Sequence, residues 1–303
     1  MTRRAARGAT DRPRPAHAAG TKTASAPPAP GAERFAGGWA VPVSTRGPSW
    51  YDLRFYHRVI AAGPTGVRAP AGARLPTAVG LAYPGIRPGQ WLVTVTTRPV
   101  GFAWCTANFV FTRNGMLGLG TAGHCAAHDA LGRYPDVTAY VVPPPASGKL
   151  PGFYHIGQFV LSHNNGIGDD FAMIRIYPRY RSWVSPTMPV WGGPTGVYTS
   201  STPTLVKHFG HGAAVGTGGT PRAGLCPILN ARHGTAFAWY GVGAPGDSGS
   251  GVEATLGPAV GNFTHIVILD GHILPGMLAG TKMTKILKIA SGWKLRKGSL
   301  IPF

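Results

Sequence analysis

Short runs of β-forming residues, separated by glycine and proline, recur along the chain from about residue 85 onward. Gly (45) and Pro (29) are abundant and only 13% of the 303 residues are charged, a composition that disfavours long solvated helices. Eight runs have the length and pattern of strands: Trp91–Thr96, Cys105–Phe111, Val137–Val142, Phe153–Leu161, Asp170–Ile176, Thr204–Phe209, Thr235–Tyr240 and Val260–Leu269. Their composition and spacing predict an all-β protein built from barrels.

One segment near the C-terminus has a helical pattern instead. Met283, Ile286, Leu287 and Ala290 would form one apolar stripe on a helix over residues 283–291. Such a stripe is more typical of a helix docked on its own domain than of a membrane anchor. No run of 18 apolar residues is present, so we expect no membrane-spanning helix.

Composition divides the chain into four parts. Residues 1–38 contain too few apolar side chains to offset the entropy lost on folding, so they are predicted to form a disordered basic arm. Residues 39–84 hold scattered aromatics and then a Gly/Ala/Pro-rich stretch, typical of a propeptide-like region or linker. Residues 85–295 contain the predicted strands and are long enough for two small barrels, and residues 296–303 form a C-terminal tail.

The net charge of +19 raises the question of nucleic-acid binding. Much of the basic excess lies outside the predicted strands, in an N-terminal and a C-terminal cluster: Arg3, Arg4, Arg7, Arg12, Arg14, Lys22, Arg34, and Lys282, Lys285, Lys288, Lys294, Arg296, Lys297. The sequence has no zinc-finger spacing, aromatic platform or repeat. We therefore expect no specific nucleic-acid partner.

Three short motifs carry the groups of a hydrolytic site, in the order Thr121-Ala122-Gly123-His124-Cys125, Asp169-Asp170-Phe171-Ala172-Met173-Ile174 and Gly246-Asp247-Ser248-Gly249-Ser250-Gly251. A serine hydroxyl attacks a carbonyl when a base removes its proton, and a buried carboxylate fixes the tautomer of that base. The order His, Asp, Ser differs from those of subtilisin and of the α/β-hydrolases. A lipase or esterase of the latter type would also need alternating βα units, which the pattern lacks.

With these motifs, residues 85–295 resemble the chymotrypsin-like serine peptidases, especially the Gly/Ala-rich secreted forms from actinobacteria. The resemblance implies two six-stranded antiparallel β-barrels with a C-terminal α-helix, and peptide-bond hydrolysis through an acyl-enzyme. It makes His124 the general base, Asp170 its carboxylate partner and Ser248 the nucleophile, and it leaves Asp169 as an exposed neighbour. The backbone N–H groups of Gly246 and Ser248 would form the oxyanion hole.

The resemblance also pairs Cys105 with Cys125 in a disulfide that clamps the histidine loop. Such bonds persist outside the reducing cytosol, so we expect a secreted protein, although the first thirty residues lack the apolar core of a signal peptide. Cys226 is then left as a buried structural thiol. Asp247 would shape the oxyanion loop, and we expect an internal arginine or a backbone donor as its partner, since no Ile-Val-Gly-Gly start is present.

A zinc site is the competing interpretation of the histidine motif. It would use His124, Cys125 and His128, but a third convincing ligand and the glutamate expected between helical histidines are missing. We therefore expect neither a metal nor another cofactor.

Val242, Thr264 and His265 are the predicted substrate-pocket residues. Val242 stands where trypsin-like enzymes carry their specificity aspartate, so cleavage after Arg or Lys is not expected and a small or apolar P1 residue fits better. Thr264 stands where the family often has a serine that supports the catalytic aspartate. His265, if it lies near the pocket, leaves an acidic P1 residue open.

The sequence thus predicts a serine endopeptidase that acts on protein or peptide substrates. The alternative is a catalytically silent protease-like scaffold that binds partners through its basic termini, which a large separation of His124 from Ser248 would favour. The sequence does not define the oligomeric state, and we expect a monomer.

Overall fold

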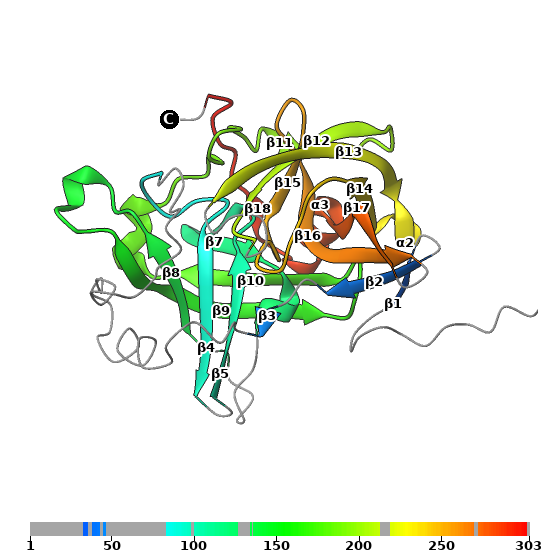
Figure 1. Ribbon diagram of the computed structural model, residues 1–303. Helices are drawn as coiled ribbons and strands as arrows, with labels where there is room; N and C mark the ends of the chain where they lie inside the picture. Colours follow the sequence, from blue (N-terminus) through cyan, green and yellow to red (C-terminus); the bar gives the residue numbers. More distant parts are fainter. Residues whose placement is uncertain are drawn as a thin grey trace, which may run out of the picture.

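The computed structural model describes residues 33–35, 38–42, 45–46, 83–97, 100–126, 134, 136–212, 219–269 and 272–301. Strands dominate this part of the chain, and they build two barrels that lie side by side (Figure 1). The predicted all-β fold of two antiparallel barrels with a C-terminal helix is confirmed. None of the helices in the described ranges is both long and apolar enough to span a membrane.

The first barrel is a curled sheet made by the following segments: β4 (Trp91–Thr97), β5 (Val100–Thr106), β6 (Val110–Arg113), β7 (Met116–Thr121), β8 (Asp136–Val141), β9 (Gly152–Asn164) and β10 (Asp170–Ile176). β5 and β6 act as one bent strand, because β5 pairs with β4 whereas β6 pairs with β7. At the bend, the N–H of Ala107 donates to Gln90 (2.9 Å) and that of Asn108 donates to Gly120 (2.7 Å). The run predicted as one strand over Cys105–Phe111 is therefore two strand segments. β5 lies at one end of the curled sheet and β6 at the other, so the bend between them brings the two ends together.

The second barrel is closed by strand pairing alone. Its strands are β12 (Thr204–Gly210), β13 (Thr220–Asn230), β14 (Ala236–Tyr240), β15 (Gly251–Ala254), β16 (Pro258–Leu269) and β17 (His272–Lys282). They follow the order β16, β15, β12, β13, β14, β17, and β17 pairs again with β16. Aromatic side chains fill the centre, where Trp239 packs edge-on against Phe263 and stacks on Phe237.

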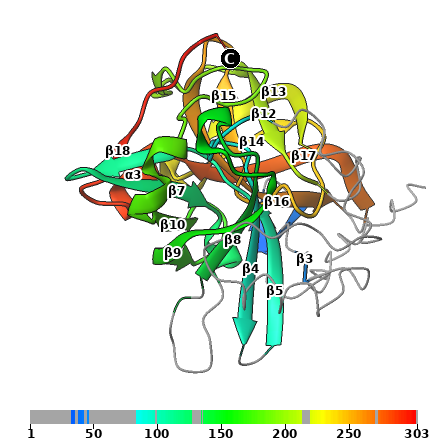
Figure 2. The same ribbon diagram turned by 90° about the vertical axis from the view of Figure 1, so that its left-hand side faces the viewer.

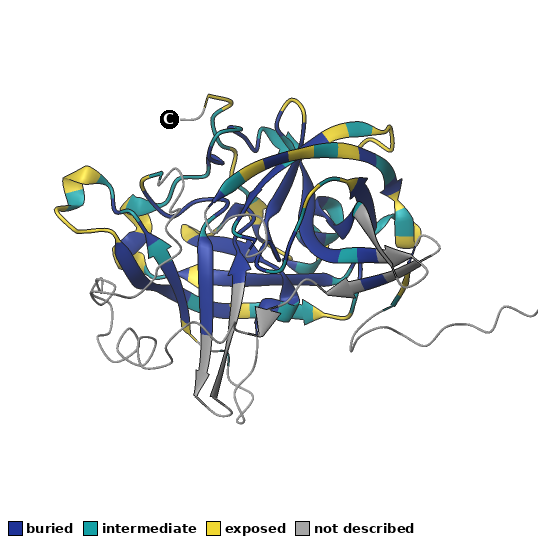
Figure 3. Ribbon diagram, viewed as in Figure 1, coloured by how far each residue is buried: buried dark blue, intermediate teal, exposed yellow. Residues whose placement is uncertain are grey.

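The C-terminal segment holds the two barrels together. The predicted helix is present as α3 (Met283–Ile289), and it buries Met283 and Ile286. Beyond it, β18 (Lys294–Leu295) pairs with β6 of the first barrel. The buried side chains of α3 share one apolar cluster with Phe111 of the first barrel and Phe209 of the second. Figure 3 colours the buried residues dark blue, and they lie along the strands of both barrels.

Short elements complete the described chain: β11 (Gly196–Val197), the 3-10 helices η1 (Gly123–Cys125), η2 (Pro145–Ser147) and η3 (Pro178–Trp183), and the one-turn α2 (Ala231–Gly234). The predicted C-terminal tail is partly described. Within it, the N–H of Gly298 donates to Pro194 (2.8 Å), and the carbonyl of Ser299 accepts from Gly193 (2.6 Å).

Three strands lie where the sequence predicts an arm and a linker: β1 (Glu33–Phe35), β2 (Gly38–Pro42) and β3 (Thr45–Arg46). β1 and β2 form a hairpin that adds to β16, and β3 adds to β5 (Figure 2). The prediction of disorder is wrong for the end of the arm, because Phe35 is buried in the second barrel's apolar cluster with Ala40 and Val267. Residues 1–32 and 47–82 lie outside the described residues.

Three histidines of the described core have lowered pKa values: His208 and His265, which are buried, and His211, which is partly buried. Burial, helped by the charge of Arg222, lowers the pKa of His208 from 6.5 to about 3, and burial lowers the pKa of His211 and of His265 to about 4. In the unfolded chain the same imidazoles bind protons near pH 6.5. The unfolded state therefore binds more protons between pH 6.5 and 4, and stability falls as the pH drops through that window.

We expect the free energy of unfolding, measured by urea titration, to fall by about 1.4 kcal/mol per pH unit for each of these histidines between pH 6.5 and 4. His208→Gln should remove one such contribution and flatten the slope. Ser200→Ala, at an exposed position that carries no titratable group, should leave the slope unchanged. Equal slopes for the parent protein and His208→Gln would contradict this account.

Candidate active site

His124, Asp170 and Ser248 come together at the junction of the two barrels. His124 lies in η1 directly after β7, Asp170 begins β10, and Ser248 lies in the turn that precedes β15. His124 Nδ1 is 2.7 Å from Asp170 Oδ2, and its Nε2 is 2.9 Å from Ser248 Oγ. A carboxylate accepts hydrogen bonds, so Nδ1 carries the proton and Nε2 presents a lone pair to the serine hydroxyl.

The carboxylate of Asp170 is buried and fully engaged by the histidine loop. Its Oδ1 accepts hydrogen bonds from the N–H groups of Gly123 and His124. Burial alone would raise the pKa of Asp170, but the charge and hydrogen bonds of His124, with a smaller contribution from His265, hold that pKa below its ordinary value. Asp170 is therefore a carboxylate at neutral pH.

Asp169 has a different environment from its neighbour. Its side chain is 28% exposed, and its Oδ1 lies 3.3 Å from Lys285 Nζ and 3.3 Å from His163 Nδ1. It makes a surface ion pair with Lys285, whereas Asp170 faces the imidazole.

Two polar residues of the second barrel support Asp170 from behind, and the sequence analysis did not identify either. Thr281 Oγ1 accepts a hydrogen bond from the N–H of Asp170 (3.1 Å) and lies 3.3 Å from its carbonyl oxygen. Asn262 Nδ2 donates to the same carbonyl at 3.1 Å. Thr264, which was expected to support the aspartate, instead has its hydroxyl 2.7 Å from His265 Nδ1. Asn262 lies in the predicted strand Val260–Leu269, two residues before Thr264, which was the residue selected from that strand.

The turn that carries Ser248 is shaped by glycines and fixed to the first barrel. Gly246 and Gly249 have φ angles of +104° and +88°, which L-residues with side chains rarely adopt. The N–H of Thr106 donates to the carbonyl of Ser248 at 2.7 Å, and its hydroxyl donates to that of Gly246 at 2.8 Å. The serine is thereby held against the end of β5 in the first barrel.

Asp247 has the internal partners that the sequence analysis anticipated. Its buried carboxylate pairs with the guanidinium of Arg222 and accepts the N–H of Ala244 at 2.9 Å. Burial raises the pKa of Asp247, and Arg222 and the backbone donor oppose that shift. The ion pair fixes the shape of the turn without an N-terminal amine.

The disulfide between Cys105 and Cys125 is present and joins β5 to η1. Both sulfurs lie near His124, but because they are bonded to each other they offer no thiolate to a metal. Cys226 is a buried free thiol whose Sγ donates to the carbonyl of Ala238 at 3.1 Å. Burial raises the pKa of Cys226 to about 12, so its sulfur stays protonated.

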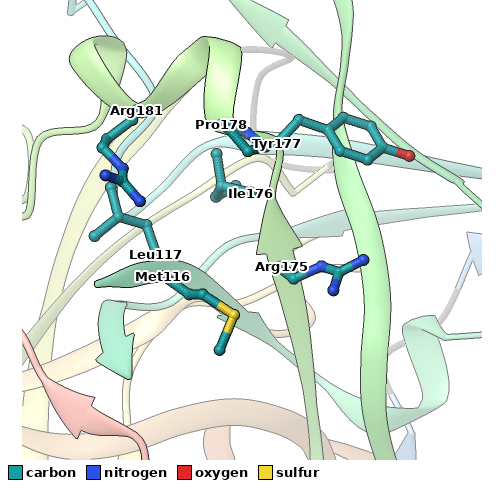
Figure 4. Close-up of a pocket in the computed structure, with 7 residues that line it drawn as sticks. All are labelled: Met116, Leu117, Arg175, Ile176, Tyr177, Pro178 and Arg181. Carbon is teal, nitrogen blue, oxygen red and sulfur yellow. The ribbon is translucent and has the colours of Figure 1, made fainter. Parts of the chain in front are cut away.

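The three predicted pocket residues do not share one environment. Thr264 and His265 are buried, whereas Val242 is 53% exposed and its carbonyl lies 3.3 Å from His208 Nε2. A hollow of about 250 Å³ is lined by Met116, Leu117, Arg175, Ile176, Tyr177, Pro178 and Arg181. Figure 4 shows these residues. This hollow lies at the ends of β7 and β10 opposite to those that carry His124 and Asp170, so it is separate from the candidate site.

No protein-family profile matches the sequence. No curated protein matches it significantly. Solved structures with a similar strand arrangement include Thermobifida fusca protease A (18% identity, TM-score 0.45, 70% of this chain and 99% of that one) and Cellulomonas bogoriensis chymotrypsin (19%, 0.42, 70% and 99%). The protease Anisep from Arthrobacter nicotinovorans is 16% identical, with a TM-score of 0.46 over 69% of this chain and 95% of that one. These three proteins are chymotrypsin-like serine proteases, the class that the sequence resembles.

Removal of the Arg222 charge should destabilise the fold, because Asp247 would remain buried without its cation. We expect Arg222→Met to lower the free energy of unfolding by about 3–5 kcal/mol, and Arg222→Met combined with Asp247→Asn to recover part of that loss. Urea unfolding at pH 7 measures both effects. Arg175→Met, at an exposed position on β10, is the matched control and should change little; a similar loss in that variant would contradict the assignment.

Proposed function

We propose that this protein is a serine endopeptidase in which Ser248 is the nucleophile, His124 the general base and Asp170 its carboxylate partner. The observation that carries the proposal is the pair of short contacts that His124 makes, 2.7 Å to Asp170 and 2.9 Å to Ser248. A silent scaffold would be favoured by a large separation of His124 from Ser248, and the short distance between them argues against it. The mostly β fold with paired barrels is compatible with this chemistry.

The chemistry follows from the proton positions in this arrangement. His124 Nε2 takes the Ser248 proton while Oγ attacks the substrate carbonyl, and the Asp170 carboxylate stabilises the resulting imidazolium. The imidazolium then protonates the leaving amine, and water hydrolyses the acyl-enzyme by the reverse proton path. The N–H groups of Gly246 and Ser248 would stabilise the oxyanion, a contribution of about 3–4 kcal/mol per donor.

Val242 and His265 support a proposal for the substrate class, and the disulfide supports one for the compartment. We propose cleavage after a small or apolar P1 residue, because Val242 provides no carboxylate for a basic P1 side chain. An acidic P1 residue is less compatible with His265, since burial keeps its pKa at about 4 and the imidazole is neutral at pH 7. We further propose that the protein is exported, because the Cys105–Cys125 disulfide persists in an oxidising compartment.

A fluorophosphonate probe should label the folded protein covalently at Ser248, because only an activated serine reacts at an appreciable rate. Peptide mapping by mass spectrometry identifies the labelled residue. Ser248→Ala should abolish labelling, and Ser200→Ala, at an exposed serine, should retain it. A folded protein that no such probe labels would exclude the serine-peptidase proposal.

The two neighbouring aspartates should respond differently to the loss of charge. Asp170→Asn removes the acceptor that fixes the His124 tautomer, and we expect kcat on a peptide substrate to fall on the order of 10⁴-fold. Asp169→Asn changes a surface ion pair and should alter kcat by less than about 3-fold. A larger loss at Asp169 than at Asp170 would reverse their assignment.

A further inference from the structure

Thr106 is a fully buried residue that contacts both loops of the candidate triad. It ends β5, directly after the disulfide residue Cys105. Its N–H donates to the carbonyl of Ser248 at 2.7 Å, and its own carbonyl accepts the hydroxyl of Thr121 at 2.8 Å. Thr121 is the last residue of β7, just before the loop that carries His124. The backbone of Thr106 therefore binds both the strand that leads to the base and the turn that carries the nucleophile.

The hydroxyl of Thr106 has two further partners, and together they fix the direction in which it donates. The N–H of His211 donates to Thr106 Oγ1 at 3.1 Å, and Oγ1 lies 2.8 Å from the carbonyl oxygen of Gly246. A backbone carbonyl can only accept a hydrogen bond, and a hydroxyl has one proton to donate. The single proton of this hydroxyl therefore points at Gly246, while a lone pair of Oγ1 receives the N–H of His211.

Two N–H groups of the turn around Ser248 stand apart from their neighbours. Those of Asp247, Gly249 and Ser250 donate to backbone carbonyls at 2.7–3.0 Å. Those of Gly246 and Ser248 donate to no acceptor in the part of the chain that the structure describes, although both residues are buried. Buried N–H groups are rarely left without a partner. This pair is thus available to an acceptor from outside the chain, and the oxyanion of the proposed reaction is such an acceptor.

The carbonyl that Thr106 holds belongs to the same residue as one of these two N–H groups. Gly246 has a φ of +104°, and glycine rotates about its backbone bonds more freely than any other residue. Its carbonyl and its N–H lie on the two peptide planes that meet at its Cα atom. The bond from Thr106 Oγ1 fixes one plane, so it limits rotation of the N–H on the other. Such control matters because a misplacement of about 1 Å can cost about 10²-fold in rate.

From these contacts we propose that Thr106 is a positioning residue of the active site: its hydroxyl holds the Gly246 carbonyl so that the N–H groups of Gly246 and Ser248 point at the substrate oxygen. The inference rests on the proposed function. Thr106 touches neither the substrate nor the reacting atoms, and it acts through the turn. Its backbone contacts do not need the side chain, so a substitution can separate the hydroxyl from them.

The rate at which a fluorophosphonate labels Ser248 tests this role, because the phosphoryl oxygen gains negative charge where a substrate oxyanion would. Thr106→Val keeps the branched shape of the side chain and removes its donor. We expect it to lower the second-order labelling rate about 10–100-fold, and we expect Thr106→Ser, which keeps the hydroxyl, to stay within about 3-fold of the parent protein. The matched control is Thr138→Val, at a buried threonine whose hydroxyl lies 3.5 Å from His155 Nδ1, and it should leave the rate unchanged.

A second reagent separates the positioning role from a general loss of structure. The thiophosphonyl analogue carries P=S in place of P=O, and sulfur is a weak hydrogen-bond acceptor, so the two N–H groups assist it less. Partial unfolding would slow both reagents equally. Misdirected N–H groups would slow the P=O reagent more, and we expect Thr106→Val to lower the ratio of the two rates by at least about 5-fold. An unchanged ratio would overturn the inference.

The outcomes distinguish this inference from the peptidase assignment. Circular dichroism checks the fold of each variant, and if Thr106→Val does not fold, Thr106→Ala removes the same donor without placing a methyl group against Gly246. A parent protein that is labelled at Ser248 no faster than the folded variant without the hydroxyl would overturn the role of Thr106 and leave the peptidase standing. A folded parent protein that is not labelled would remove both.

Discussion

The contact between Asp170 and the second barrel is the interaction on which the rest of the site depends. The carboxylate of Asp170 is saturated by the histidine loop, whereas its backbone is held by Thr281 and Asn262 of the other barrel. A buried charge needs such complete hydrogen bonding, since each missing partner leaves a desolvation cost of several kcal/mol. These hydrogen bonds join the barrels at the place where His124 meets Ser248.

Paired strands of the barrels approach each other closely at glycines. The same glycines explain why the sequence pattern missed several strands. β7, β13, β15 and β17 were not predicted, and each contains or adjoins glycine or proline that interrupts the β pattern. The structure supplies the reason at Gly280 of β17, where a Cβ atom would collide with the carbonyl of Asn262 on the paired strand β16. Small barrels need glycine where two backbones approach this closely, and these glycines weaken the sequence signal of the strands that contain them.

The sequence analysis identified the three candidate catalytic residues more readily than the residues that hold them in place. His124, Asp170 and Ser248 lie in motifs whose neighbours are informative, and the disulfide partner Cys125 follows the histidine directly. Thr281 and Arg222 are single polar residues within strands, and their partners are about 111 and 25 residues away in sequence. Only a correct register brings such pairs together, so no local pattern could have assigned them. The same limit applies to Thr264, which faces His265 rather than the aspartate.

One edge of β16 pairs with two different strands, β15 and β2, near the turn that carries Ser248. β17 pairs with β16 along residues 261–269, so β15 and β2 must both use the opposite edge, β15 at residues 259–262 and β2 at residues 265–268. β15 is short because the chain before it turns away to present Ser248, and this turn frees the edge that β2 occupies. The turn that carries Ser248, just before β15, therefore lies close to the part of the β16 edge that β15 leaves free. In this chain the strand on that part of the edge is β2, which comes from the N-terminal segment and adds to the second barrel.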